Sequence, residues 1–523
     1  MSESVPDLAS FPRRIHELVE RHAAERPEAL ALIDHDGRHL TWRDFRAAAD
    51  AMERHLRGAG VRGGDRVLVI LENSVTAVAA LMAASRLDAW AALVNARLAA
   101  PELARIRDHC EPRAIVFTTG ASADAARHAA GAGAQEIADP LVGTFAVAGS
   151  RAATPEPVEE SNAGQVAAMI YTSGTTGNPK GVMLTHRNVL YIAVVSGAIR
   201  ALSADDLVYA VLPVSHVFGL ASTCLGTIAA GGTLQLVNRF DPAHLAAALR
   251  GGVTVFQGVP AMYARLLEHL DHRGEALAAP RLRYMSSGGA PLDLDWKRRI
   301  EARFGLALNN GYGLTEASPT VAQTRIDDPR DDDSIGPALP GLDIRFVDRQ
   351  GHDVPEGEVG ECWVRGPTVM KGYYRDPGAT AAAVTPEGWL RTGDLGRRAA
   401  DGNLFLVGRA KELTIRSGFN VYPPEVETAL NAHPDVVQSA VVGRRVSGNE
   451  EVVAFVEVMP GSTVDEAELK KFVGERLAAY KRPQHVFVVG RMPASSTGKV
   501  QKHMLVALAE EMIAKKTEAK ASA

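Results

Sequence analysis

Apolar residues follow two patterns along the first part of the chain. In Arg14–Arg26 they recur at helical spacing, whereas Arg66–Leu71 and Arg113–Phe117 each contain one short, uninterrupted apolar run. Such runs are typical of strands buried on both faces of a sheet. The longer apolar stretch Val75–Val94 is interrupted by charged residues, and we interpret it as a buried helix and not as a membrane span. Strands that alternate with helices predict an α/β fold with a parallel sheet.

The later parts of the chain repeat this alternation and then depart from it. Gly143–Gly164 is rich in small and polar residues, which predicts a surface connection. Further strands are expected at Val166–Tyr171, Val253–Phe256 and Leu282–Met285. Between about residues 336 and 407, Gly-Pro turns and short alternating runs indicate a smaller β-rich unit. The C-terminal part is mixed again, with helices predicted near Pro424–Ala432 and Val464–Leu477 and a frayed helix after Glu510.

Composition narrows the class of protein. The 523 residues exceed what one hydrophobic core usually holds, so several structural units are expected. The net charge of −5, from 57 basic and 62 acidic residues, favours neither nucleic acid nor an anionic membrane as a partner. Three widely spaced cysteines predict reduced thiols and no disulfide framework. Because no apolar segment follows the N-terminus, no secretory signal is expected, and we predict a cytoplasmic location.

The stretch Tyr171–Gly181 carries the strongest chemical signal. Its three glycines permit close approach of the backbone, its hydroxyl side chains supply donors, and Lys180 adds a positive charge. The residues expected to bind a polyphosphate are Thr172, Ser173, Gly174, Thr175, Thr176, Gly177 and Lys180. The stretch joins two apolar strands, whereas a Walker loop would run into a helix, so a P-loop NTPase is not indicated. A polar turn without ligand is the alternative for this loop taken alone.

This loop resembles the signature of the adenylate-forming superfamily, which contains acyl-CoA synthetases, luciferases and the adenylation domains of peptide synthetases. Further matching motifs follow in the family's order: Ser286–Pro291, Asn310–Glu316, Leu390–Asp394, Gly408–Lys411, Ile415–Glu425 and Ser495–Lys499. The resemblance covers nearly the whole chain and points to the acyl- or aryl-CoA ligase branch. It implies a large N-terminal domain of stacked α/β layers with a β-rich subdomain (1–408), a hinge (409–412), and a small mobile α+β domain (413–523).

In the large domain, the resemblance assigns roles to two motifs and one histidine. Tyr312 would lie along the adenine, Thr315 would contact the α-phosphate, and Glu316 would hold Mg²⁺, a cation that prefers oxygen ligands. The other residues expected to contact nucleotide or acyl group are Gly288, Gly289, Ala290, Asn310, Gly311 and Gly313. His216 would line the wall between the acyl pocket and the entry for the thiol. A histidine satisfied within the core is an equally good interpretation of His216.

In the C-terminal part, the resemblance assigns roles to further residues. Asp394 would accept from the ribose hydroxyls, Arg409 would support the nucleotide, and Lys411 would be the hinge. Ser417 and Gly418 would lie beside the pantetheine of coenzyme A (CoA). Some plant aryl-CoA ligases carry lysines in place of Ile415 and Ser417, so the exact CoA contacts stay open. Lys499 would be the adenylation lysine, although for a lysine outside such a motif a solvated charge is the usual interpretation.

The implied reaction joins a carboxylate to CoA with ATP and Mg²⁺ as cofactors. The acid would attack ATP to give acyl-AMP and pyrophosphate, and CoA would then displace AMP after the small domain rotates. The residues expected to serve this chemistry are Lys499, Glu316, Thr315, Lys180 and His216. The segments that resemble the family's acyl pocket contain no lysine or arginine, which favours an apolar fatty, cyclic or aryl monocarboxylate.

Three alternatives remain at this stage. A stand-alone adenylation enzyme could load a carrier protein instead of CoA, but the chain lacks the aspartate that amino-acid modules usually place within Val214–Phe218. Nothing in the sequence favours a luciferase. A non-catalytic nucleotide-binding regulator would be expected to have lost Lys499 or Glu316, and both are present. Small-molecule carboxylate and CoA are therefore the expected partners, and a homodimer is left open.

Overall fold

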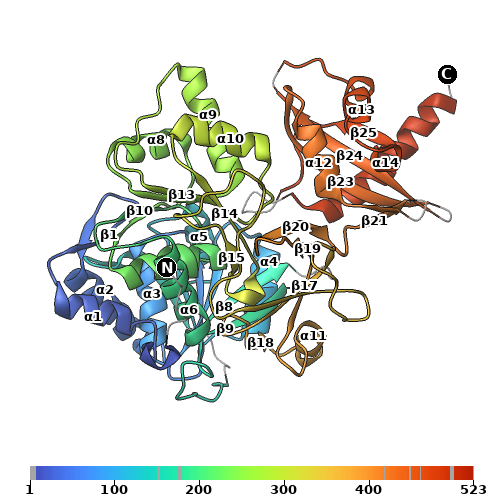
Figure 1. Ribbon diagram of the computed structural model, residues 1–523. Coiled ribbons are helices and arrows are strands. Elements are labelled where there is room, and N and C mark those ends of the chain that lie inside the picture. The colour runs from blue at the N-terminus through green and yellow to red at the C-terminus, as the bar shows by residue number, and fades with distance from the viewer. Residues whose placement is uncertain are drawn as a thin grey trace. The chain divides into compact units, whose positions relative to one another are not determined.

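The computed structural model describes residues 7–149, 154–173, 179–416, 419–446, 449–459, 461–494 and 500–521 (Figure 1). The chain forms two compact units. The first comprises Met1–Gly289, Arg298–Ile344 and Trp363–Arg391, and the second comprises Ala290–Lys297, Arg345–Cys362 and Thr392–Ala523. The phosphate-loop strands and Glu316 therefore belong to the first unit, whereas Asp394, Arg409 and Lys411 belong to the second.

Two large sheets organise the first unit, and they include the short apolar strands that the sequence predicts. One sheet has the order β15 (Thr320–Gln323), β14 (Leu308–Gly313), β13 (Tyr284–Ser287), β12 (Val255–Gly258), β10 (Leu207–Ala210), β11 (Thr233–Leu236), β1 (Leu30–Ile33), β2 (His39–Thr41). The other has the order β18 (Gly372–Tyr373), β9 (Pro179–Thr185), β8 (Val166–Ser173), β4 (Trp90–Asn95), β3 (Arg66–Leu71), β5 (Ala114–Phe117), β7 (Gly143–Gly149), β6 (Gln135–Asp139). Their central strands are parallel, as expected for an α/β fold.

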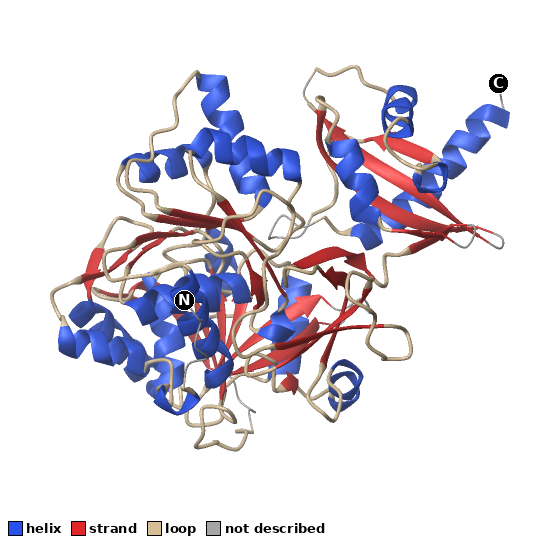
Figure 2. Ribbon diagram, in the orientation of Figure 1, coloured by secondary structure: helices blue, strands red, loops and turns tan. Residues whose placement is uncertain are grey.

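Helices cover these strands (Figure 2). The helices that lie wholly in the first unit are α1 (Glu17–Glu25), α2 (Trp42–Gly58), α3 (Val75–Arg86), α4 (Ala100–Cys110), α5 (Ala123–Gly131), α6 (His186–Ile199), α7 (Gly226–Ala230), α8 (Pro242–Arg250), α9 (Pro260–Arg273) and α11 (Pro377–Ala383). A further helix, α10, spans Leu294–Phe304. Between β10 and α7 the chain forms a π-helix, Phe218–Leu225, in which seven residues from Gly219 to Leu225 are buried.

A four-stranded sheet follows in the chain, with the order β16 (Asp343–Val347), β17 (Gly360–Arg365), β19 (Leu390–Arg398), β20 (Leu404–Arg409). It corresponds to the predicted β-rich unit. Beyond it lie the hairpin β21 (Thr414–Arg416) and β22 (Phe419–Val421), and the sheet β23 (Val436–Val446), β24 (Asn449–Val458), β25 (His485–Val488). The helices of this part are α12 (Pro423–Asn431), α13 (Glu466–Gly474) and α14 (Lys502–Ala521).

The three-stranded sheet buries both of its faces. Along β24, the side chains of Val452, Ala454 and Val456 join one apolar cluster with α12 and α13, and those of Val453 and Phe455 join another with α14. This alternation is the period of two expected for a strand, and Figure 2 shows helices packed on this sheet. The observed architecture confirms the predicted fold class, a mixed α/β fold with a large and a small part.

Two local predictions were wrong in part. The apolar stretch Val75–Val94 is helix α3 followed by strand β4, because the chain turns at Asp88, whose φ is +52°. The predicted surface connection begins with strand β7, which pairs with β5. The helix predicted after Glu510 is confirmed: it is the second half of α14, whose buried residues are Leu505, Ala509 and Ile513.

Candidate active site

The predicted phosphate loop lies between two antiparallel strands of the second large sheet. Strands β8 and β9 pair with Thr172 opposite Lys180 and Ser173 opposite Pro179. This confirms that the loop joins two strands. Gly174, Thr175, Thr176 and Gly177 lie outside the described residues. The register places Lys180 at the second position of β9, close to where this strand leaves the predicted loop.

The two glycine-containing motifs of the first unit follow neighbouring parallel strands of the other large sheet. Ser287 at the end of β13 is in register with Asn310 of β14. Ligands of open α/β sheets usually bind beyond the carboxyl ends of the strands. Gly288 lies close to Phe218, since a Cβ atom at Gly288 would stand 3.1 Å from its ring. The motifs are therefore adjacent at one sheet edge.

Individual residues of these motifs have distinct structural roles. The side chain of Asn310 donates to the carbonyl of Ser334 at 3.0 Å and accepts from the N–H of Gly311 at 3.0 Å, so this side chain holds the backbone. Gly289 has a φ of +77°, which favours glycine. A Cβ atom at Gly313 would lie 2.2 Å from the carbonyl oxygen of Pro319, which excludes a side chain there. Tyr312 and Thr315 are buried.

Glu316 and Lys180 meet the same side chain, that of Tyr373. The Tyr373 hydroxyl donates to Glu316 Oε1 at 2.8 Å, and the Lys180 Nζ lies 4.8 Å from the centroid of the Tyr373 ring. Tyr373 sits on the two-residue strand β18, which pairs with β9. The structure therefore brings together the predicted phosphate-loop lysine and the predicted metal ligand. Sequence reasoning missed Tyr373, because so short a strand has no hydrophobic period.

His216 precedes the π-helix and contacts its start. Its Nδ1 accepts a hydrogen bond from the backbone N–H of Phe218 at 3.2 Å, and its carbonyl accepts from the N–H of Leu220 at 2.9 Å. A neutral imidazole in this arrangement carries its proton on Nε2. The imidazole is half-buried, and its predicted place in the pocket wall stays a prediction.

Two residues with predicted roles at the nucleotide are cross-strand partners in the second unit. They are Asp394, predicted to accept from the ribose, and Arg409, predicted to support the nucleotide. Asp394 of β19 lies opposite Arg409 of β20, and the two side chains form an ion pair of 2.9 Å. Asp394 is buried, whereas the Arg409 side chain is half exposed. Ala290 also belongs to this unit. Ser417, Gly418 and Lys499 lie outside the described residues, although Ala494 and Val500 pair across the ends of the segment that contains Lys499.

The last residue of the predicted hinge, Glu412, belongs to a partly buried ion-pair cluster. The Lys502 Nζ lies 2.8 Å from a carboxylate oxygen of Glu412 and 2.8 Å from one of Glu427, on α12. Burial alone would lower the pKa of Lys502, but the two carboxylates outweigh burial and raise this pKa above its ordinary value. Through these two ion pairs, Lys502 connects Glu412, at the end of the predicted hinge, to helix α12 of the second unit.

We expect Lys502→Met to loosen this segment. Two partly buried carboxylates would lose their cation, which costs roughly 1–3 kcal/mol of local stability. Hydrogen exchange measured by mass spectrometry should become about 5- to 100-fold faster in peptides spanning 409–416 and α12. Lys515→Met is the control, because its pair with Glu511 is exposed and weak. Equal exchange in both variants would show that Lys502 does not fix the segment.

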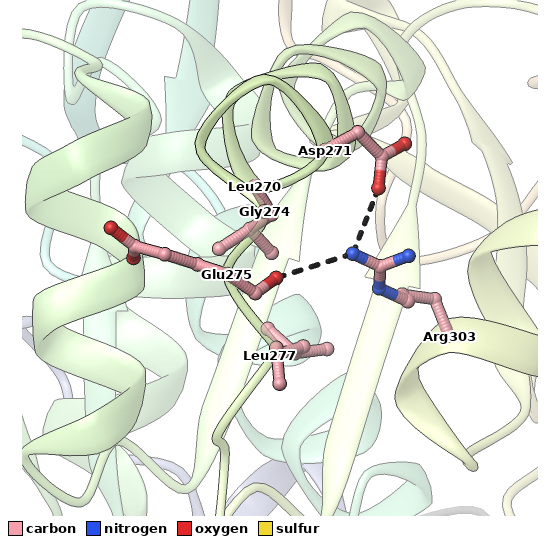
Figure 3. A pocket seen from close by; sticks show the side chains of 7 residues that line it. Leu270, Asp271, Gly274, Glu275, Leu277 and Arg303 are labelled. Carbon is pink, nitrogen blue, oxygen red and sulfur yellow. Dashed lines mark hydrogen bonds and ion pairs between the residues drawn. The ribbon is translucent and has the colours of Figure 1, made fainter.

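Two other features of the first unit do not belong to this site. A hollow of about 590 Å³ is lined by residues of α9, the segment after it, and Arg303 of α10. Figure 3 shows Arg303 bridging the Asp271 carboxylate and the Glu275 carbonyl, and none of the motif residues lines the hollow. Asp34, His35 and Asp36 are close enough to share a metal ion, but Asp34 already accepts from Arg38 and from the N–H of Val75.

Comparison with known families identifies the class of this protein. The family of AMP-binding enzymes matches residues 19–374, and the family of AMP-binding enzyme C-terminal domains matches residues 425–499. The chain belongs to the AMP-binding enzymes, which are the adenylate-forming superfamily. The resemblance stated from the motifs is thereby confirmed.

Individual relatives narrow the class. A feruloyl-CoA synthase of Amycolatopsis sp is 36% identical over 92% of this chain and 96% of its own length. A sulfoacetate–CoA ligase of Cupriavidus necator is 34% identical over 94% and 96%, respectively. ATP-bound MatB from Rhodopseudomonas palustris, a solved structure, is 32% identical and has a TM-score of 0.84, covering 95% of this chain and 99% of its own. The chain is an AMP-forming carboxylate–CoA ligase that uses ATP and CoA.

None of the helices in the described part of the chain has both the length and the apolar composition that crossing a membrane requires.

Proposed function

We propose that the carboxylate substrate is an apolar monocarboxylic acid with an aryl, cyclic or fatty tail. The observation that carries this proposal is the absence of lysine and arginine from the segments expected to line the acyl pocket. These segments are 214–226, 256–260, 286–290 and 312–320. A second carboxylate buried there would lack a cation partner, which is costly. An apolar tail gains about 25 cal/mol per Å² of buried surface.

The nearest candidate cations support the same proposal. Arg325 is buried and donates to the carbonyls of Gln323 and Ala338. Arg200 is buried and donates to the carbonyl of Ser222 at 3.0 Å and to the side chain of Gln323 at 3.1 Å. Both guanidinium groups are therefore engaged by neutral acceptors. Arg200 lies against the π-helix, so a second carboxylate in the pocket would have to compete with these acceptors for its guanidinium group.

The names of several relatives point in the same direction. Besides the feruloyl-CoA synthase, they include an indoleacetate–CoA ligase of Aromatoleum aromaticum and a 4-coumarate–CoA ligase of Oryza sativa. The sulfoacetate–CoA ligase is a relative whose substrate carries a second charge. The proposal therefore rests on the pocket segments of this chain, with the aryl relatives as support.

For the first half-reaction, we assign the predicted binding residues of the site to two sets of substrate anions: the pyrophosphate portion of ATP, and the α-phosphate with the incoming carboxylate. Lys180 and the loop hydroxyls would bind the pyrophosphate portion of ATP, while Lys499 and Thr315 would bind the α-phosphate and the incoming carboxylate. Both reactants are anionic, so the site must cancel charge while aligning them. Asp394 would accept from the ribose hydroxyls, and Arg409 would hold that carboxylate in place.

The residues present fit a bound Mg²⁺. Only Oε1 of Glu316 is engaged by a described residue, Tyr373, which leaves Oε2 as an oxygen ligand. Mg²⁺ in nucleotide sites usually takes one or two carboxylates and keeps several waters. When bound, it would neutralise phosphate charge. One relative, MenE of Bacillus subtilis, has been solved with ATP and magnesium.

For the second half-reaction, we infer that the small domain rotates about Lys411 and presents Ser417 and Gly418 to the pantetheine. The thiol sulfur then attacks the acyl carbon, and AMP leaves. We further propose a cytoplasmic enzyme, with a homodimer as its oligomeric state to be tested. Loading of a carrier protein is the less supported alternative, because the relatives named above are CoA ligases.

A panel of acids tests the proposed substrate class. Malonate, acetate, hexanoate, octanoate, benzoate and 4-coumarate should be compared by pyrophosphate release with CoA present, and the thioester confirmed by mass spectrometry. We expect the highest kcat/KM for an apolar monocarboxylate. A malonate preference would overturn the proposal, and its loss in Arg200→Gln would then locate the second carboxylate. Product formed only with a carrier protein would favour the alternative.

A further inference from the structure

Tyr373 contacts two oppositely charged residues to which the proposed function assigns the same ligand. Its hydroxyl donates to Glu316 Oε1 at 2.8 Å, and its ring lies 4.8 Å from the Lys180 Nζ. Within the described residues, no ion pair joins Lys180 directly to Glu316. A phenol is suited to this position, because the ring face attracts a cation while the hydroxyl donates to a carboxylate. The Tyr373 side chain therefore interacts favourably with both the carboxylate of Glu316 and the ammonium of Lys180, and neither group loses its charge.

The backbone fixes Tyr373 relative to both partners. Tyr373 lies opposite Val182 of β9, two residues after Lys180, and the N–H of Tyr374 donates to the carbonyl of Gly181 at 2.8 Å. On the other side, the N–H of Met370 donates to the carbonyl of Glu316 at 2.9 Å. The N–H of Tyr373 itself donates to the Thr380 hydroxyl at 2.9 Å. Strand β18 thus connects the end of the phosphate loop to the turn that carries Glu316.

The phenol suits the role of a donor. Its hydroxyl donates to one oxygen of Glu316 at 2.8 Å, and the side chain is half-buried. When one oxygen of a carboxylate accepts a hydrogen bond from a fixed donor, the direction of its other oxygen is fixed as well. Residues that hydrogen-bond to a metal ligand orient it in this way.

We propose that Tyr373 is a positioning residue for the adenylation half-reaction. It holds Glu316 with Oε2 directed to the metal–phosphate complex, and it keeps Lys180 from collapsing onto that carboxylate before ATP binds. The ligand involved is a divalent cation bound to a nucleoside triphosphate. This inference rests on the proposed role of Glu316, and the experiment below separates the two.

Tyr373→Phe tests the hydroxyl alone, since the ring is kept. Binding of Mn²⁺ in the presence of ATP and without a carboxylate substrate, followed by electron paramagnetic resonance, should weaken about tenfold. The Mg²⁺ concentration for half-maximal ATP–pyrophosphate exchange should rise by about the same factor, while kcat at saturating Mg²⁺ stays near the wild-type value. Tyr373→Leu also removes the cation–π contact and should raise the KM for ATP a further roughly two- to five-fold.

Tyr374→Phe is the matched control. Tyr374 follows in the chain and its hydroxyl donates to Glu156 Oε1 at 2.8 Å, so the same kind of hydrogen bond is removed elsewhere. This variant should bind Mn²⁺ as the wild type does. Unchanged Mn²⁺ binding in Tyr373→Phe would overturn the inference. If Glu316→Gln still weakened binding, only the inference would fail; if Glu316→Gln were also without effect, the proposed metal ligand would fail too. A fall in kcat with no shift in Mg²⁺ dependence would indicate a merely structural role.

Discussion

Lys499→Ala is expected to abolish most of the adenylation activity and to spare thioester formation. The lysine would meet the α-phosphate and the attacking carboxylate, two anions that repel each other as the bond forms. Removing a preorganised cation from such a site costs roughly 2–4 kcal/mol in the barrier, or about 30- to 1,000-fold in rate. The expected effect is large because the developing charge is desolvated, and no neutral side chain can replace the ammonium.

Each half-reaction can be measured separately. ATP–pyrophosphate exchange with a good acid reports adenylation, and release of AMP from supplied acyl-AMP and CoA reports thioester formation. Lys515→Ala is the control, because Lys515 is an exposed lysine of α14 in the same unit. If Lys499→Ala lowered both half-reactions equally, the lysine would not be specific to adenylation, and its assignment would be wrong.

The sequence predicted those strands whose hydrophobic pattern is complete within one short segment of the chain. Strand β3 and the strands β8 and β9 were predicted because each is a short, continuous apolar run. Strand β4 was missed because it continues the apolar stretch of α3, and periodicity cannot separate two buried elements of different type. The helix ends at Arg86, and the chain turns at Asp88, whose φ is positive. Aspartate tolerates this conformation better than most residues, but it is also common on exposed helix faces, so its presence alone does not predict the turn.

For the candidate site, the sequence likewise predicts residues but not the contacts that these residues make. The motifs predict Lys180, Glu316 and Asp394 as residues of one chemistry, since each lies in a signature with a characteristic order, and these roles stay predictions. What they contact could not be predicted, because these contacts depend on pairing between strands far apart in the chain. Tyr373 reaches Glu316 through the pairing of β18 with β9, and Lys502 reaches Glu412 through the packing of the small unit.

Lys411→Pro tests the hinge. In the structure, Lys411 lies in a turn in which the carbonyl of Arg409 accepts from the N–H groups of Glu412 and Leu413 at 3.0 and 3.1 Å. Proline fixes φ near −65°, and at this third position of a turn it also restricts the residue before it. A domain rotation about Lys411 needs that dihedral to change. The variant should therefore adenylate within about twofold of the wild type and form thioester on the order of 100-fold more slowly, because the thiol is misplaced.

Lys411→Ala separates the dihedral from the charge, because alanine removes the ammonium and leaves φ free. We expect this variant to form thioester at nearly the wild-type rate. Both variants should be compared by single-turnover transfer from acyl-AMP to CoA, with the thermal midpoint as a check on folding. Equal slowing in both would assign the effect to the lost ammonium. Wild-type rates in both half-reactions for Lys411→Pro would place the pivot elsewhere in residues 409–416.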